Sequence, residues 1–213
     1  MTAGTREPRR REGTLRRRED ILKAAFATFG SKGYKNGPLT EIAEQVDMTH
    51  AGILHHFGSK DQLLLEVLRY RDESDVAELE DKHIPGGIDL FAHLVATAKL
   101  NMQRPGIVQA YAVLSSESVT DDHPAREFFE ARYRTLRLEV SDAFREVCAD
   151  HGVTDERSIE SGAAAILAVM DGLQVQWLLD PEAVDLGAAT EFAIRAIVDS
   201  VVNPNPRALG ARS

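Results

Sequence analysis

Adjacent histidines in the first third of the chain could serve two kinds of chemistry, metal binding or hydrogen bonding to a nucleic acid. His55 and His56 are followed by Asp61 and Glu66, which are also metal-ligand types. Neighbouring helical residues point about 100° apart, so this pair cannot easily share one tetrahedral metal ion. The remaining histidines lack a G-x-S-x-G, H-E-x-x-H or glycine-rich phosphate-loop context. The sequence therefore predicts no catalytic residue, no metal site and no cofactor.

The residues just before the histidine pair suit DNA better. Thr49, His50, Ala51, Gly52 and His55 would share the outer face of a short helix. These are small or hydrogen-bonding groups: glycine permits close approach to base edges, and an alanine methyl can meet a thymine methyl. From the pattern alone, ordinary packing between two helices explains such a helix as well as DNA binding does.

Three helices are expected to position this face. Apolar residues at helical spacing predict one helix over residues 14–30, followed by short helices over 38–46 and 49–56. Only Asp47 and Met48 separate the two short helices, and a capping box at Ser59 opens a long helix beyond them. Two short helices joined by a tight turn form a helix-turn-helix, whose second helix enters the major groove.

The rest of the chain also has a helical period. Five further helices are expected, over about 88–103, 105–118, 124–150, 155–179 and 185–202. No segment alternates with period two, so the predicted fold class is all-α. The predicted organisation is a disordered basic arm over 1–13, a helix-turn-helix domain over 14–58, a larger helical domain over 59–203, and a frayed tail over 204–213.

Charge is distributed unevenly along the chain. Its 213 residues carry a formal net charge of −9. Residues 1–60 hold 11 basic and 7 acidic residues, a net of +4, and the remainder holds 14 and 27, a net of −13. Such asymmetry is typical of a protein in which one part meets a polyanion. A solvated arginine-rich tail without a partner is the alternative.

Cysteine usage and hydropathy bear on the compartment. Cys148 is the single cysteine, which excludes an internal disulfide and is consistent with a reducing compartment. No apolar segment follows the N-terminal arginines, and no apolar run reaches the roughly 18 residues that span a bilayer. We expect a cytoplasmic, nucleoid-associated protein with no membrane partner.

The run ILKAAFATFGSKGYKNGPLTEIAEQVDMTHAGILHHFGSKDQLLLEVL resembles the TetR family of bacterial transcriptional regulators, over about residues 18–68. The resemblance lies in I-x-x-A-A-x-x-x-F ending in K-G-Y, in E-I-A, and in H-H-F-G-S-K-x-x-L-L. The later run MDGLQVQWLLDP is similar to the penultimate helix of that family. Asp47 stands where the family usually has glycine, and aspartate tolerates the left-handed conformation. Leu54 replaces a usual tyrosine, which removes one phosphate hydrogen bond.

The resemblance, combined with side-chain chemistry, implies a set of DNA contacts. Thr49, His56 and Lys60 would meet phosphates, and the arginine arm would add attraction that is independent of sequence. The full predicted set is Arg16, Arg17, Arg18, Thr40, Thr49, His50, Ala51, Gly52, Leu54, His55, His56 and Lys60.

The resemblance also implies a ligand pocket and a dimer interface in the second domain. The predicted pocket residues are Met102, Ile107, Tyr111, Leu114, Phe128, Phe129, Tyr133, Met170, Gln174 and Trp177. The predicted interface residues are Gly162, Ala165, Ile166, Val169, Leu173, Phe192, Ala196 and Asp199. The alternative for both sets is that they are part of a monomer's own core, of which apolar residues at helical spacing are also typical.

The predicted function is a sequence-specific transcriptional regulator, a ligand-released repressor that binds a palindromic operator as a homodimer. An apolar or amphipathic small-molecule effector would shift the helix that begins at Ser59 and so release the DNA. The alternatives are a transcriptional activator and an architectural DNA-binding protein without a ligand. An enzyme with a histidine-based site is a third alternative, which the motifs disfavour.

Overall fold

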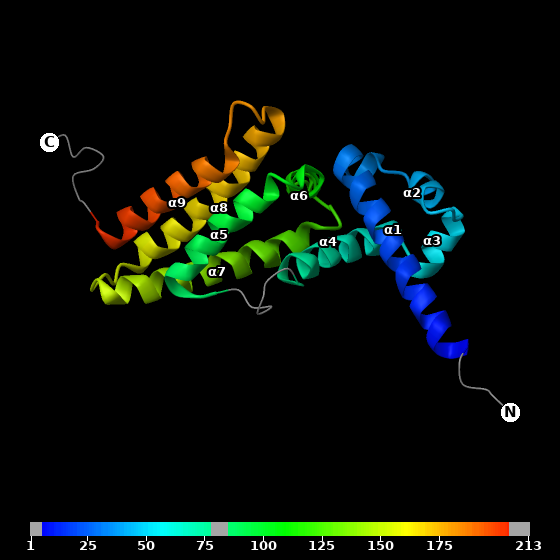
Figure 1. Cartoon of the computed structure of the whole chain (residues 1–213), viewed down its shortest axis with the longest axis horizontal. Helices are drawn as coiled ribbons and strands as arrows, with labels where there is room; N and C mark the ends of the chain where they lie inside the picture. The colour runs from blue at the N-terminus through cyan, green and yellow to red at the C-terminus, as the bar shows by residue number, and fades with distance from the viewer. Residues whose placement is uncertain (1–5, 78–84, 205–213) are drawn as a thin grey trace. The chain divides into compact units, whose positions relative to one another are not determined.

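The computed structural model describes residues 6–77 and 85–204, with side chains described within 13–72 and 85–204. These ranges contain nine helices and no strand, which confirms the all-α prediction (Figure 1). The helices are α1 (Arg6–Asn36), α2 (Leu39–Gln45), α3 (His50–Phe57), α4 (Lys60–Ala77), α5 (Gly87–Asn101), α6 (Pro105–Glu117), α7 (Arg126–Asp150), α8 (Glu156–Leu179) and α9 (Leu186–Val202).

Helix α1 is longer than its apolar pattern predicts. It begins at Arg6 and not at Thr14, which corrects the predicted disordered arm from Arg6 onward; residues 1–5 lie outside the described residues. The segment is rich in arginine and glutamate, which favour helix. Pro8 falls in the first turn, where its missing N–H removes no helical bond. Near its other end α1 breaks at Gly33, whose φ is 74° and ψ is 169°.

The chain divides into two compact units. Unit 1 comprises Met1–Glu80 and Gln109–Phe129, and unit 2 comprises Asp81–Val108 and Glu130–Ser213. The predicted domain boundary at residue 59 therefore differs from the structure, because α4 packs against α1 within unit 1. Its apolar residues Leu63, Leu64, Val67 and Leu68 are all buried.

The core of unit 1 fixes the helix-turn-helix. Helix α2 packs against α1, and α3 packs against both α2 and α4. One side chain from each of the first three helices, Phe29, Ile42 and Ile53, is fully buried. Burying a large apolar side chain contributes roughly 1.5–3 kcal/mol, so these residues hold α3 at a defined angle.

Unit 2 is a helical bundle in which α8 lies beside α9, and α9 lies beside α5 (Figure 1). Its main core cluster includes Phe91 and Phe144, whose ring centroids are 4.8 Å apart. Cys148 is a free thiol in the same cluster, and burial raises its pKa.

Within the described ranges, α8 is long and apolar enough to cross a membrane by length and composition alone, with a mean hydropathy of 1.4 over an 18-residue window. Glu160 and Asp171 interrupt the apolar sequence of the helix, so it contains no unbroken apolar run of the roughly 18 residues that span a bilayer. Part of the helix is buried in unit 2, where Ile159, Ala163, Ile166 and Met170 pack in the core cluster.

Candidate nucleic-acid interface

The turn between α2 and α3 depends on Asp47. The Asp47 N–H donates to the Glu44 carbonyl at 3.3 Å, and the Met48 N–H donates to the Ala43 carbonyl at 2.9 Å. This pair of bonds is the Schellman ending of a helix, which requires a left-handed residue. Asp47 has a φ of 52°, as predicted for the aspartate that stands in the usual glycine position.

Helix α3 begins at a side-chain cap and presents an uncharged face. The Thr49 hydroxyl accepts a hydrogen bond from the Gly52 N–H at 3.1 Å, which satisfies one of the free amides of the first turn. Four of the predicted contacts, Thr49, His50, Ala51 and His55, are exposed. No residue of α3 is Asp, Glu, Lys or Arg.

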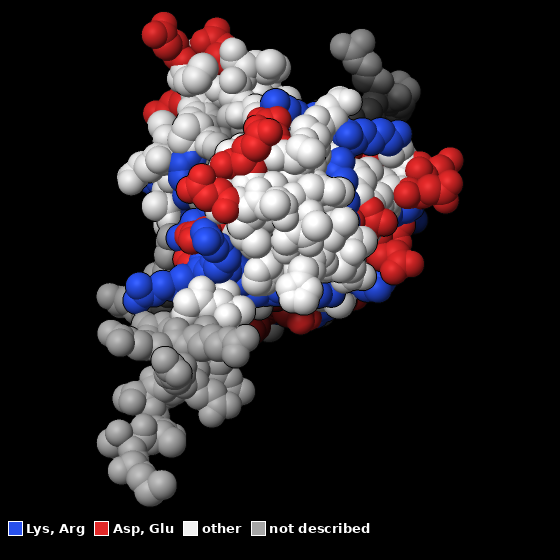
Figure 2. Space-filling model, turned by 90° about the vertical axis from the view of Figure 1, so that its right-hand side faces the viewer, with Lys and Arg blue, Asp and Glu red and all other residues white. Residues whose placement is uncertain are grey.

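The other predicted contacts of α3 are less accessible. Gly52, Leu54 and His56 are half-buried, and the buried Ile53 and Phe57 hold the opposite side of the helix. Figure 2 shows the side of the molecule on which α2 and α3 lie in Figure 1, where a broad uncharged area is bordered by basic and acidic side chains. Such a surface can read base edges, with cations around it to meet phosphates.

Thr40 and Lys60 flank α3 in different ways. Thr40 is exposed in the first turn of α2. Lys60 is half-buried: its ammonium donates to the Lys35 carbonyl at 3.3 Å and lies 4.6 Å from the centroid of the Tyr34 ring. Burial lowers the Lys60 pKa. Lys60 thus joins α4 to the end of α1 and must turn outward to meet a phosphate.

The predicted arginine cluster separates into different environments. Arg16 and Arg17 are both exposed. Arg17 donates to the carbonyl of Val46, at the end of α2, at 3.2 Å. A cation is favourable there because the last carbonyls of a helix carry partial negative charge.

Arg18 is engaged within unit 1. Its guanidinium donates to the His56 carbonyl at 3.2 Å and to the Glu66 carboxylate at 2.8 Å, and it lies 4.4 Å from the centroid of the Phe57 ring. These contacts join α1, α3 and α4. We therefore reassign Arg18 from DNA contact to positioning α3, a role that its sequence position did not indicate.

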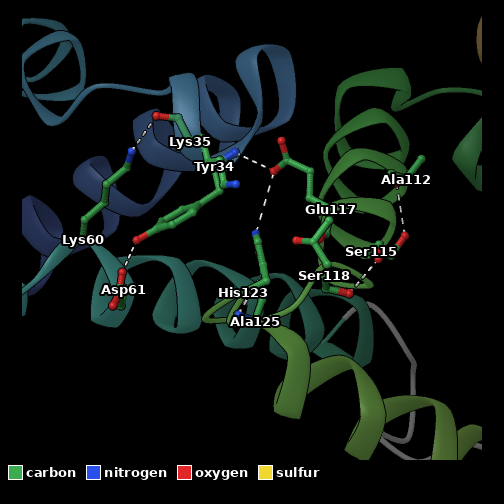
Figure 3. A network of polar contacts seen from close by, with 11 residues as sticks. Tyr34, Lys35, Lys60, Asp61, Ala112, Ser115, Glu117, Ser118, His123 and Ala125 are labelled. Atoms are coloured by element: carbon green, nitrogen blue, oxygen red, sulfur yellow. Dashed lines mark hydrogen bonds and ion pairs between the residues drawn. The ribbon is translucent and has the colours of Figure 1, made fainter.

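A polar network around Tyr34 was not predicted (Figure 3). The Glu117 carboxylate, at the end of α6, accepts the Tyr34 N–H at 2.7 Å. The Tyr34 hydroxyl donates to the Asp61 carboxylate, and burial and this bond raise the pKa of the phenol. His123 stacks edge-on against the Tyr34 ring at 5.4 Å. Tyr34 belongs to the K-G-Y motif, which was the one local signal available.

The ten predicted pocket residues do not all lie in one unit. Unit 1 contains Tyr111, Leu114, Phe128 and Phe129, and unit 2 contains Met102, Ile107, Tyr133, Met170, Gln174 and Trp177. Within unit 1, the ring of Phe129 lies 5.4 Å from that of Tyr111 and 5.3 Å from that of Phe128. Within unit 2, the Tyr133 hydroxyl donates to Asp171 at 2.7 Å, and Asp171 was not predicted.

The predicted interface residues fall on different faces of unit 2. Ala165, Val169 and Leu173 are half-buried, whereas Phe192, Ala196 and Asp199 are exposed. The prediction needs correction at Gly162 and Ile166, which are buried in the unit's own core. A Cβ added at Gly162 would lie 2.8 Å from Val201, so its small size serves packing inside the subunit.

The exposed residues of α8 neighbour the predicted interface residues in the sequence. They include Ala164, Ala168, Gly172, Val175 and Leu179. Leu179 is 81% exposed, and Phe192 on α9 is 77% exposed. Exposed apolar side chains mark a surface that meets a partner where they form a contiguous patch.

Metal-ligating side chains do not gather in the described part of the chain. No group of three or more His, Cys, Asp or Glu residues that could hold a metal ion occurs there. His55 and His56 lie side by side with ring centroids 6.1 Å apart.

Comparison with known proteins yields two family models. Residues 21–67 match the model described as "Bacterial regulatory proteins, tetR family". Residues 89–202 match the model described as "BetI-type transcriptional repressor, C-terminal". The chain is 27% identical over 199 residues to the HTH-type transcriptional regulator BetI of Rhizobium meliloti, and the match covers 91% of each chain.

Solved structures share the fold. A putative transcriptional regulator from Pseudomonas aeruginosa has a TM-score of 0.71 at 21% identity, covering 93% of each chain. A putative transcriptional regulator from Saccharomonospora viridis, solved in complex with choline, has a TM-score of 0.57 at 22% identity. That match covers 88% of this chain and 96% of the other.

Proposed function

The chain belongs to the TetR family of bacterial transcriptional regulators, and from this premise we propose that it is a homodimeric repressor that a small-molecule effector releases from a palindromic operator. The α3 face carries this proposal. It is exposed, uncharged and rich in hydrogen-bonding groups, and the α2–α3 turn and the Arg18 contacts hold it in place. The role is binding and not catalysis, and we expect it to be exercised in the cytoplasm, at the nucleoid.

Base reading is assigned to the exposed part of α3. His50, Ala51 and His55 would face the base edges, with Gly52 allowing close approach. Thr49 and Thr40 would donate their hydroxyls to phosphates, and Arg16 and Arg17 would add attraction that depends on salt. A homodimer would place two α3 helices in successive major grooves, roughly 34 Å apart.

Selection of bound duplexes from a random pool tests this assignment. We expect two inverted half-sites whose centres lie one helical turn apart. No enriched sequence, or a specificity ratio near one, would instead favour an architectural protein. Transcription in vitro from the selected site distinguishes a repressor from an activator, because a repressor lowers the yield of transcript.

The exposed apolar residues of α8 and α9 favour a second copy of this chain as partner. Leu179 and Phe192 project from adjacent, packed helices of unit 2. Sedimentation of Phe192→Glu should shift the protein toward monomer, because a carboxylate cannot be buried there unpaired. Leu138→Glu is a matched control, since Leu138 is an exposed apolar residue of α7. Equal dissociation in the two variants would contradict the assignment.

Asp171 favours a cationic effector over a purely apolar one. Burial raises its pKa, although the Tyr133 hydroxyl and nearby Arg132 partly oppose this shift. A bound cation would relieve the remaining penalty of a desolvated carboxylate. The chain is similar to a protein solved with choline, so choline is a suitable first probe.

Thermal unfolding with choline and with its uncharged carbon isostere, dimethylbutanol, tests the charge of the effector. We expect choline alone to raise the melting temperature, and Asp171→Asn to abolish the rise. Equal shifts with both compounds would return the proposal to an apolar effector. A 100-fold weakening of operator affinity requires about 2.7 kcal/mol of differential binding by the effector.

A further inference from the structure

We propose that Glu117 is a positioning residue for DNA binding: from α6, it fixes the broken end of α1 and, through Tyr34, the first turn of α4. This inference rests on the proposed function, because it takes the α2–α3 face as the surface that reads DNA. Every residue in the argument belongs to unit 1.

The break in α1 creates the need for an acceptor outside the helix. Gly33 has a non-helical conformation with positive φ, which redirects the N–H of Tyr34 away from the helix axis. Glu117 accepts that N–H at 2.7 Å, a short bond that the negative charge strengthens. The carboxylate also fills the space where a Cβ of residue 33 would stand. Gly33 and Glu117 are therefore suited to each other.

Tyr34 transmits this restraint to α4. Its hydroxyl donates to the carboxylate of Asp61. The Lys60 ammonium lies 4.6 Å from the ring centroid, within the range of a cation–π contact. Tyr34 is thus held at its backbone by α6 and at its side chain by α4, as Figure 3 shows.

His123 closes the other side of the carboxylate. Its ring is buried, and its Nδ1 accepts the N–H of Ala125 at 3.2 Å. The proton of the neutral ring therefore resides on Nε2, which lies 4.0 Å from the Glu117 carboxylate, beyond hydrogen-bond length. The Tyr34 amide thus keeps the closer contact with Glu117.

The first turn of α4 connects directly to the reading helix. Only Gly58 and Ser59 separate Phe57, the last residue of α3, from Lys60. A shift of that turn must therefore move the end of α3. The expected consequence of losing the Glu117 contact is a reading helix held less firmly, with fewer base contacts made at one time.

The test compares Glu117→Ala, Glu117→Gln and the control Glu127→Ala, using the duplex that the wild-type protein selects from a random pool. Glu127 is exposed in the first turn of α7, and its removal changes the net charge by the same amount. We expect Glu117→Ala to bind about five- to tenfold more weakly. Glu117→Gln should retain most of the affinity, because its amide oxygen still accepts the Tyr34 N–H. Glu127→Ala should bind equally well or more tightly, since it reduces repulsion from DNA.

Two further measurements separate positioning from a general loss of folded protein. The affinity for the selected duplex relative to that for a scrambled duplex should fall by the same five- to tenfold in Glu117→Ala, because α3 carries no Lys or Arg and its displacement weakens base reading and not ionic attraction. The amide proton resonance of Tyr34 should move upfield in Glu117→Ala and not in Glu127→Ala.

The inference is overturned if Glu117→Ala binds as tightly as Glu127→Ala, or if it lowers only the fraction of active protein and leaves the ratio of affinities for the selected and scrambled duplexes unchanged. It is also overturned if Glu117→Gln is as weak as Glu117→Ala. A wild-type protein that selects no sequence would overturn the proposed function itself, which is a distinguishable result.

Discussion

The α3 surface and the Tyr34 network, both in unit 1, use their polar groups in opposite ways. Among the described residues, the side chains of His50 and His55 make no hydrogen bond to another residue. By contrast, Tyr34 bonds both Glu117 and Asp61. The difference indicates that α3 keeps its polar groups available for an outside partner, whereas the network uses its polar groups to hold helices in place.

Two glycines allow this contrast to be tested with the same substitution, and the largest effect is expected at Gly30. A Cβ there would lie 2.5 Å from the Cβ of Ala110 and 2.9 Å from its Cα, so α1 and α6 would have to separate. We expect Gly30→Ala to lower the free energy of unfolding by about 1–3 kcal/mol. Urea titration measures the loss, and an unchanged midpoint would show that the contact is not tight.

Gly52→Ala should have the reverse profile. The added Cβ would lie 3.0 Å from the Met48 methyl, which can move, and alanine favours helix by about 1 kcal/mol over glycine. We expect unchanged or higher stability, with roughly tenfold weaker binding to the selected duplex, because a methyl would stand between α3 and the bases. Retained affinity would remove Gly52 from the reading surface.

A smaller effect is expected at His123. Its substitution tests whether the stability that the Tyr34 network provides depends on pH. Burial lowers the pKa of His123, with opposing contributions from Glu117 and Asp61 and a further lowering by Lys35. The pKa of His123 in the folded protein therefore lies below its ordinary value. The stability that the neutral ring contributes is fully present at a pH above the ordinary pKa, and it is lost as the pH falls through the folded pKa. His123→Asn keeps an acceptor for the Ala125 N–H without titrating.

The measurement is the free energy of unfolding of wild type and His123→Asn between pH 7.5 and about pH 5. We expect the wild type to lose more stability than the variant over this interval. Parallel curves would indicate that another group controls the acid sensitivity.

The smallest effect is expected at Asp171 in unit 2. Its substitution tests whether a polar side chain inside a helical bundle is kept available for binding a ligand. Burial raises its pKa, so any stability that it contributes is present at low pH and is lost as pH rises through the folded pKa. Asp171→Asn should raise the melting temperature slightly at pH 7 while still accepting the Tyr133 hydroxyl. The exposed control Glu160→Gln, on the same helix α8, should not change it. A lower melting temperature would assign Asp171 a purely structural role.

Most helices could be predicted because their signals are local. The stretch predicted over 105–118 is α6, Pro105–Glu117, and the one over 155–179 is α8, Glu156–Leu179. Pro105 begins α6, Pro181 follows the end of α8, and apolar residues recur within both helices. The start of α1 was mispredicted because residues 1–13 are polar and basic and contain Pro8 and Gly13, although proline is compatible with a first helical turn.

The site was predictable only in its exposed part. The exposure of Thr49, His50, Ala51 and His55 follows from the period of one helix. The engagement of Arg18 depends on Glu66, 48 residues away, and that of Tyr34 depends on Glu117, 83 residues away. No local pattern specifies such pairs, because the tertiary packing of separate helices brings them together. Gly162 was assigned to the dimer interface but is buried in the core of unit 2. A small residue allows close packing within a subunit as well as between subunits, and the sequence does not distinguish the two.

Helix α3 contains no Asp, Glu, Lys or Arg, and this has a kinetic consequence. Electrostatic capture of DNA, which accelerates encounter and sliding, must come from other parts of the protein, such as the arginines of α1. Once the protein has reached the operator, recognition by α3 relies on short-range hydrogen bonds and methyl contacts, which salt screens little. Raising the ionic strength should therefore slow the search for the operator strongly. It should change much less the ratio of the residence time on the operator to the residence time on random DNA.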